Sequence, residues 1–308
     1  VAITEAAPNF LVAGAHDCGS YILDSDSLWK HVSYGDGSFC LIDQSNPSIF
    51  YTSVNTQIIN NGGGKIMDTW KIGQPIGMHP INSNILYATM YENQIHYFKK
   101  SDSYGDPGTW QTLTSVSNHM SDISFVSDDP DKFYMVIHNR WWVPGSVYKP
   151  TKLLFTNNGG SSFTEVSYDG IGSIIDDTPI TSVKSHPYDS QLVWVTLGGY
   201  HLNKKVYFSC DGGDYWENIS GTGLPNLPVQ CMEYDFLNGI LFAGTDVGLY
   251  VKSVEDSNWE EAGNGFNLPH SVISSLKLNK ASGDLIVGTY GRGVYKTNLG
   301  EGYCRVTG

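Results

Sequence analysis

A pattern of about forty residues repeats along this 308-residue chain, and it restricts the possible folds more than any other feature. An aromatic residue follows a segment rich in turn residues six times, and the successive spacings are 41, 40, 53, 53 and 43 residues. The six positions are Trp29, Trp70, Trp110, Phe163, Trp216 and Trp259. A repeat of this length is typical of a supersecondary unit that needs its neighbours to complete a core.

Each repeat predicts four short β-strands. In the fifth repeat, ITSVKS, QLVWVTL, KVYFSC and YWENIS read as consecutive strands separated by Gly, Pro, Asn and Asp. Counting the first strands gives seven units, with approximate bounds 1–33, 34–73, 74–115, 116–168, 169–221, 222–263 and 264–308. No stretch favours a helix.

Four-stranded meanders that cannot cover their own faces pack side by side around an axis. The sequence therefore predicts an all-β chain that forms a single seven-bladed β-propeller over residues 1–308, with four-stranded antiparallel blades. The strand that closes the seventh blade is left open. It comes either from the tail around Tyr303 or from residues that precede Val1 in a longer parent chain.

Composition excludes several classes of protein. Apolar residues make up 40% of the chain, enough for a sizeable core, yet no run approaches the roughly 20 apolar residues of a membrane helix. The 31 acidic and 18 basic side chains give a net charge of −13, which would repel a phosphate backbone. We therefore expect neither a membrane span nor a nucleic-acid partner.

Two turn segments share the pattern Ser/Thr-x-Asp/Asn-x-Gly-x-x-aromatic. In such a turn the Asp or Asn accepts backbone N–H groups, glycine takes a positive φ, and the aromatic packs between sheets. The residues are Ser209, Asp211, Gly213 and Trp216 in SCDGGDYW, and Thr156, Asn158, Gly160 and Phe163 in TNNGGSSF. They resemble the Asp-box, or BNR repeat, of sialidases, sortilin-type receptors and xyloglucanase-type glycoside hydrolases. The resemblance implies a structural role, because the box lies away from the active site in those families.

Longer segments are similar to Asp-box propellers in secreted proteins of the Bacteroidetes type. Near the C-terminus these are GTDVGLYVK at 244–252, GFNLP at 265–269 and GTYGRGVYKT at 288–297. Near the N-terminus, AGAHDCGSYI and GDGSFCLIDQSNP match the QDNG and GGDG segments, although His16 and Cys18 replace Gln and Asn. The resemblance implies export to the medium or the cell surface, often as one module of a longer protein.

In a propeller, the loops between second and third strands emerge on one face together with the links between blades. We predict that this face binds a ligand, since binding residues concentrate on loops held by a rigid scaffold. The candidate binding residues are Arg140, Trp141, Trp142, Tyr148, Tyr200, His201, Tyr290 and Arg292. The insertion at 138–151 is the longest, and an exposed tryptophan there would form a platform for a sugar ring or a partner side chain. In the other interpretation both tryptophans pack beneath the loop.

Asp17 and Asp36 are the candidates for acid–base catalysis, because glycoside hydrolysis needs two nearby carboxyl groups. The segment AHDCGSYILD also resembles the TD-x-GG-x-Y segment that carries a catalytic aspartate in xyloglucanase-type enzymes. Asp246 has the equivalent position in another repeat, which favours a turn-capping role instead. Those enzymes also work in a cleft between two propellers. Sialidase chemistry is not expected, since it needs three clustered arginines and only Arg140 and Arg292 occupy loop positions.

The five cysteines leave two interpretations open. Cys18 and Cys40 are 22 residues apart, and Cys210 and Cys231 are 21 apart, so two disulfides are expected in an exported protein. In a reducing compartment all five would be buried thiols. No Cys/His spacing predicts a metal site, and no cofactor is expected. Calcium at Asp128/Asp129 or Asp176/Asp177 is the one exception considered, because carboxylate oxygens suit that ion.

These observations favour an exported, non-enzymatic binding or adhesion module that recognises a glycan or a surface protein through its loop face. The first alternative is a glycoside hydrolase that acts on a β-glucan through Asp17 and Asp36. The second is a structural module of a larger cell-surface assembly, with other domains of the same parent chain as its partners.

Overall fold

A computed structural model describes residues 1–24, 28–54, 57–60, 72–93, 95–116, 120–137, 151–262 and 268–299. The chain divides into two compact units. Unit 1 contains residues 1–120 and 279–283, and unit 2 contains residues 121–278 and 284–308. Among the described residues, no helix has the length and apolar character needed to cross a membrane.

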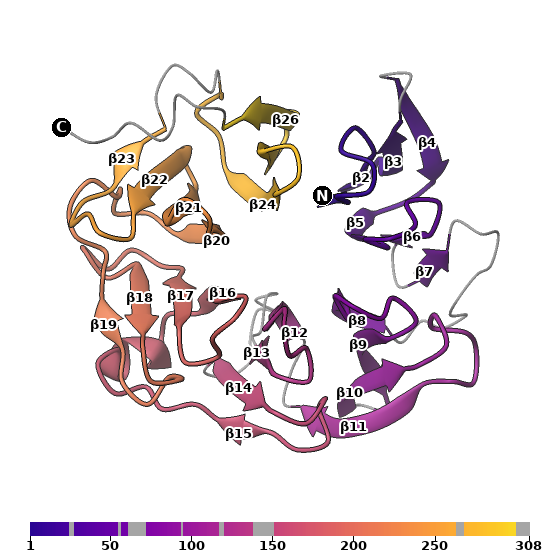
Figure 1. The fold of residues 1–308 in the computed structure, drawn as a ribbon, viewed down its shortest axis with the longest axis horizontal. Helices are drawn as coiled ribbons and strands as arrows, with labels where there is room; N and C mark the ends of the chain where they lie inside the picture. The colour runs from indigo at the N-terminus through magenta and orange to yellow at the C-terminus, as the bar shows by residue number, and fades with distance from the viewer. Residues whose placement is uncertain are drawn as a thin grey trace. The chain divides into compact units, whose positions relative to one another are not determined.

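Unit 1 is built from antiparallel meanders in chain order (Figure 1). The first sheet contains β1 (Ala2–Ile3), β2 (Leu11–Ala15), β3 (Gly19–Leu23) and β4 (Trp29–Ser33). The second contains β5 (Gly37–Ile42), β6 (Phe50–Val54) and β7 (Gln57–Asn60), and the third contains β8 (Ile72–Met78), β9 (Leu86–Glu92), β10 (Ile95–Ser101) and β11 (Gln111–Val116).

Unit 2 continues the same pattern. Its sheets are β12 (Met120–Phe125), β13 (Phe133–Ile137), β14 (Lys152–Thr156) and β15 (Thr164–Glu165), then β16 (Ile180–Ser185), β17 (Val193–Leu197), β18 (Val206–Ser209) and β19 (Glu217–Asn218). They are followed by β20 (Val229–Asp235), β21 (Ile240–Thr245), β22 (Leu249–Ser253) and β23 (Glu260–Glu261), and by β24 (Ile273–Asn279), β25 (Asp284–Thr289) and β26 (Gly293–Asn298). One short 3₁₀ helix, η1 (Gly172–Asp176), precedes β16.

The all-β prediction and the four-stranded antiparallel meander are confirmed, and within each unit the sheets follow one another as propeller blades do. The prediction of seven four-stranded blades is wrong for the described residues: five sheets have four strands and two have three. The segment around Trp70 and the tail around Tyr303, which would supply the missing strands, lie outside the described residues. The prediction that no helix occurs is also wrong, because η1 folds within the long link between β15 and β16.

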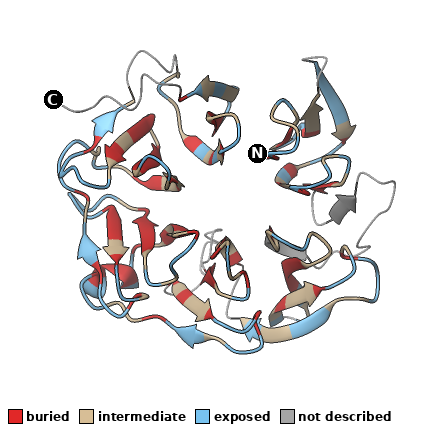
Figure 2. Cartoon of the chain, in the orientation of Figure 1, coloured by how far each residue is buried: buried red, intermediate tan, exposed pale blue. Residues whose placement is uncertain are grey.

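The second strand of each sheet carries the core. Strands β13, β17 and β21 are buried at every residue, and their sequences FYMVI, VWVTL and ILFAGT are continuous apolar or small runs. Such runs are typical of strands covered on both faces. The fourth strands β15, β19 and β23 are exposed throughout, and Figure 2 shows this gradient from buried red to exposed blue across the sheets.

The periodic aromatic residue connects one sheet to the sheet before it. Trp216 is 1% exposed and packs with Tyr134 and Val136 of the preceding sheet, while its indole N–H donates to the Ser167 carbonyl at 2.9 Å. Trp259 donates in the same way to the Ile219 carbonyl at 3.2 Å. The forty-residue spacing therefore reflects a packing contact that recurs between successive sheets.

We predict that Trp216→Ala lowers the free energy of unfolding by about 3–5 kcal/mol, because it empties a buried site of that volume. Urea unfolding followed by far-UV circular dichroism measures the change. Trp29→Ala is the matched control, since Trp29 has the same place in its repeat but is 44% exposed. Equal losses for the two variants would contradict the role assigned to the buried indole.

Candidate functional site

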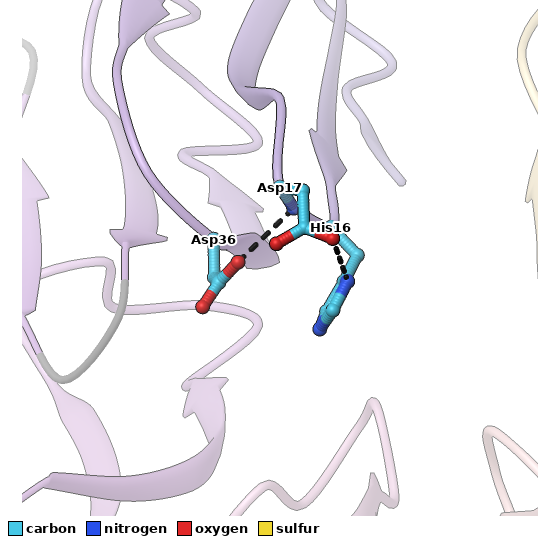
Figure 3. Close-up of side chains that lie close together, drawn as sticks. All are labelled: His16, Asp17 and Asp36. Carbon is cyan, nitrogen blue, oxygen red and sulfur yellow. Dashed lines mark hydrogen bonds and ion pairs between the residues drawn. The ribbon is translucent and has the colours of Figure 1, made fainter.

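The structure brings the two predicted catalytic carboxylates together in unit 1 (Figure 3). Asp17 lies in the turn between β2 and β3, and Asp36 lies directly before β5. The backbone N–H of Asp17 donates to Oδ1 of Asp36 at 3.0 Å, and His16 Nδ1 lies 3.0 Å from Oδ2 of Asp17. Each of the three residues offers one atom that could bind a metal ion, and these three atoms lie within 4.8 Å of one another.

Glycines allow this approach. A Cβ on Gly37 would come within 1.9 Å of the Gly19 carbonyl oxygen, and one on Gly14 would come within 2.6 Å of the Ser38 carbonyl oxygen. The turn that carries Asp17 therefore presses directly on the backbone that carries Asp36. Asp17 itself has φ of 61°, a left-handed conformation that Asp tolerates better than most residues.

The environment of this cluster limits its chemistry. The side chains of His16 and Asp17 are 66% and 80% exposed, so the described residues around them leave both in contact with solvent. Asp36 is half-buried and uses one oxygen to hold the amide of Asp17. A histidine nitrogen and two carboxylate oxygens are ligand types that divalent transition metals accept. The sequence did not predict this set as a metal site, because its members are 20 residues apart and meet only through the fold.

A second candidate site is a hollow of about 350 Å³ in unit 2. Its lining residues come from η1 and from the loop between β17 and β18: Ile171, Gly172, Ser173, Ile174, Asp177, His201 and Lys204. Ile171 and Ile174 are buried and form part of the apolar core beneath it. Tyr200 and Leu202, which flank His201 in the loop, are 66% and 68% exposed.

Polar contacts order the rim of this hollow. Asp177 accepts a hydrogen bond from the Thr178 hydroxyl at 2.9 Å and lies 3.4 Å from His201 Nε2. These two contacts, chiefly the hydroxyl, hold the pKa of Asp177 below its ordinary value. The neighbouring Lys205 is buried, which lowers its pKa, and its Nζ donates to the Gly199 carbonyl at 2.8 Å. The hydrogen bond from the buried Lys205 side chain to the Gly199 carbonyl thus fixes the loop that presents Tyr200 and His201.

The other predicted binding residues have mixed outcomes. Tyr290 is 73% exposed and Arg292 is exposed, both on the turn between β25 and β26. Arg140, Trp141, Trp142 and Tyr148 lie outside the described residues. Asp129 pairs with Lys132 at 2.9 Å, and Asp177 is engaged as above, so calcium at either Asp pair stays a prediction. Neither η1 nor Lys204 was predicted from the sequence, since neither belongs to a recognisable motif.

The turn motifs form local hydrogen-bonded loops. Gly213 N–H donates to the Ser209 hydroxyl at 2.8 Å, and Tyr215 N–H donates to Asp211 at 3.0 Å. Thr156 and Asn158 form the same contacts with Gly160 and Ser162, at 3.1 and 3.0 Å.

A third turn of this kind was not predicted from the sequence. Gly105 N–H donates to the Ser101 hydroxyl at 3.1 Å, as in the two turns above. Its tryptophan, Trp110, comes nine residues after the serine instead of seven, so the spacing hides the repeat. The shared signal is a hydroxyl residue four positions before a glycine.

Both predicted disulfides are wrong, because Cys18, Cys40, Cys210 and Cys231 are free thiols. Cys18 is exposed in a turn, whereas Cys40 is buried with Val12 and Phe50. Cys210 follows the end of β18, while Cys231 lies near the start of β20. Nearly equal spacing in the sequence does not bring these sulfur atoms together.

The contacts of the second pair show why. Trp194 packs on Tyr234 with ring centroids 4.6 Å apart and pairs with Phe208 across β17 and β18. Cys231 is three residues before Tyr234, and Cys210 is two residues beyond Phe208. The two cysteines therefore lie at different levels along adjacent sheets, too far apart for the geometry of a disulfide.

No family model and no curated protein matches this chain. Solved structures do resemble it. An ancestral GH74 enzyme aligns over 85% of this chain and 36% of its own, with 15% identity and a TM-score of 0.63. The extracellular domain of a putative one-component system from B. thetaiotaomicron aligns over 94% of this chain and 38% of its own, with 14% identity and a TM-score of 0.63. A chain of the COPII outer coat vertex on membranes aligns over 94% and 80%, with 9% identity and a TM-score of 0.66.

At these identities the likeness shows the fold alone. This chain spans little more than a third of the length of the first two structures, at 36% and 38%.

We predict that alkylation of the native protein at pH about 8 labels Cys18 and Cys210 and spares Cys40 and Cys231. Burial raises the pKa of Cys40 to about 11 and that of Cys231 to about 12, so both remain protonated thiols. Peptide mass mapping before and after denaturation in guanidinium measures the labelling. A peptide pair cross-linked through any two of these residues in the unreduced protein would contradict the assignment.

Proposed function

We propose that this chain is an exported, non-enzymatic binding module that recognises a glycan through the loops between second and third strands. The observation that carries the proposal is the hollow between η1 and the loop at 198–204. Tyr200, which directly precedes the lining residue His201, is exposed. Its volume of about 350 Å³ falls within the range of small-ligand sites, about 300–1,000 Å³.

The chemistry of this hollow suits a sugar. A pyranose presents C–H groups on its faces and hydroxyl groups around its edge. An exposed tyrosine such as Tyr200 offers an aromatic face for the first. Asp177 offers acceptor oxygens, and Lys204 and His201 offer donors, for the second.

Export is part of the proposal. It is supported by the resemblance of the turns at 156–163 and 209–216 to the Asp-box and by the fold shared with an extracellular domain. Because the two expected disulfides are absent, the cysteines no longer contribute to this inference. Contacts from Trp141, Trp142, Tyr290 and Arg292, and a surface protein as the ligand, remain further predictions of the same proposal.

We predict that a glycan array probed with the purified protein gives specific hits, and that Tyr200→Ala and His201→Ala each weaken binding of the best hit by about tenfold or more. Isothermal titration calorimetry measures the affinity. Tyr188→Ala is the matched control, because Tyr188 is 61% exposed on a turn at the other end of the same sheet. Binding that is unchanged by the two loop variants, or lost equally in the control, would refute this site.

A second candidate function, glycoside hydrolysis of a β-glucan, is favoured by the contact between Asp17 and Asp36. Their nearest oxygens lie within 4.8 Å, closer to the carboxyl spacing of retaining enzymes, about 5–5.5 Å, than to the 6.5–9.5 Å of inverting ones. The exposure of Asp17 weighs against it, since the general acid of such enzymes relies on a desolvated carboxyl group. We therefore rank hydrolysis second.

If the chain is a hydrolase, incubation with xyloglucan or another β-glucan releases reducing ends, and Asp17→Asn lowers that rate by at least about 10²-fold. A colorimetric reducing-end assay measures it. Asp246→Asn is the matched control at the equivalent turn of another repeat. Activity that survives Asp17→Asn would exclude this residue from the chemistry.

A further inference from the structure

Six turns of unit 2 form one end of its sheets. They join first to second strands or third to fourth strands, so they lie at the opposite end from the loop at 198–204, which joins a second strand to a third. The turns are residues 126–132, 157–163, 186–192, 210–216, 235–240 and 253–258, and we name them the acidic turn surface.

Direct contacts make this surface continuous. Asp128 N–H donates to the Pro187 carbonyl at 3.1 Å, and Gly159 N–H donates to the Asp131 carbonyl at 2.9 Å. Further along, Gly212 N–H donates to the Gln191 carbonyl at 2.9 Å, and Val254 N–H donates to the Gly239 carbonyl at 2.8 Å. The ring centroids of Tyr188 and Phe236 lie 5.4 Å apart and connect the turn at 186–192 to the turn at 235–240.

Charge on this surface is almost entirely of one sign. Its turns carry nine carboxylates, of which Asp235 is buried, against one lysine, Lys132, which is paired with Asp129. The buried Lys252 directly precedes the last turn and interacts with Asp256. The nine are Asp128, Asp129, Asp131, Asp189, Asp211, Asp214, Asp235, Glu255 and Asp256. Burial raises the pKa of the Tyr134 phenol, and the charges of Asp189, Asp211 and Asp214 raise it further.

Apolar side chains stand among these carboxylates. Tyr188 is 61% exposed, Tyr215 is 59% exposed, Leu237 is 66% exposed and Val254 is 43% exposed. Beneath them, His186 contacts both Tyr234 and Phe236, at centroid distances of 5.9 and 6.2 Å. Tyr188 therefore stands on a packed aromatic base that extends to Phe236, the neighbour of Leu237, and contiguous exposed apolar patches mark interaction sites.

Folding accounts for only some of the carboxylates. Asp211 and Asp235 accept backbone N–H groups of their own turns, from Tyr215 at 3.0 Å and from Leu237 at 3.2 Å. Asp214, Glu255 and Asp256 are exposed, and their carboxylates accept no hydrogen bond from another described residue. These three carboxylates are not needed to hold the turns, although Asp256 interacts with the buried ammonium group of Lys252.

We propose that the acidic turn surface docks a basic, amphipathic segment of a partner protein. Lysine or arginine side chains of that segment pair with the exposed carboxylates, and its apolar side chains cover Tyr188 and Leu237. Charge complementarity selects this occupant, because a nucleic acid or an anionic lipid surface is repelled by the same field. Cations also stack on tyrosine rings, which Tyr188 and Tyr215 provide. The site is separate from the glycan hollow.

The test uses the full chain and three labelled synthetic peptides of equal length: one alternates Arg and Leu, one alternates Arg and Ser, and one alternates Glu and Leu. Fluorescence anisotropy at about 50 and about 300 mM NaCl measures binding. We expect the Arg/Leu peptide to bind at least about tenfold more tightly than either other peptide, and to weaken at the higher salt concentration.

Variants locate the surface. Tyr188→Ser with Leu237→Ser, and Asp214→Asn with Glu255→Gln, each weaken the Arg/Leu peptide by about tenfold, and circular dichroism checks that all variants are folded. Tyr200→Ser with Asp246→Asn is the matched control at the other end and leaves this affinity unchanged. Equal binding of the Arg/Ser peptide, an equal loss in the control, or no binding at the lower salt concentration overturns the proposal. None of these results bears on glycan binding at Tyr200.

Discussion

Burial of the second strand on both faces is the constraint on which the rest of this structure depends. A single meander covers neither face of that strand, so each sheet is stable only against its neighbours. The clusters in unit 2 show this directly: Trp194 and Val206 of one sheet pack on Val229 and Met232 of the next. Every loop and turn discussed above is positioned because these strands cannot move relative to one another without opening the core.

The same constraint made much of the fold predictable. Strands such as VWVTL and ILFAGT read as fully apolar because both of their faces are covered, and the turns that precede them carry side chains that cap the backbone. His186 Nδ1, for example, accepts the amide of Tyr188 at 3.2 Å, and Asp235 does the same for Leu237. Topology also placed Tyr200 and His201 at a loop end, and it brought Asp17 next to Asp36.

Features that depend on how far along its strand a side chain lies, or on irregular backbone, could not be predicted in this way. Spacing in the sequence could not reveal that Cys210 and Cys231 lie at different levels of adjacent sheets. The helix η1 has no amphipathic period over its five residues, and it folds because Ile174 and Ile175 are buried against the neighbouring sheet. Lys204 belongs to the hollow only because η1 lies beside its loop. The hollow therefore could not be predicted from the sequence, whereas the loop that forms half of it could.

The two ends of the unit 2 sheets differ in charge for a reason that begins in folding. A tight turn needs a side-chain acceptor for its unpaired amides, and Asp supplies one in the turns at 210–216 and 235–240. Once such residues recur in successive turns, their charges accumulate at one end of the sheets. Turn capping does not require Asp214, Glu255 or Asp256, which extend the negative field beyond the need of the backbone. At the other end, the loop at 198–204 presents Lys204 and His201 beside Asp177, so groups of both signs meet there. A scaffold held by the same core thus presents two ends of different chemistry, on which the two proposed binding surfaces rest.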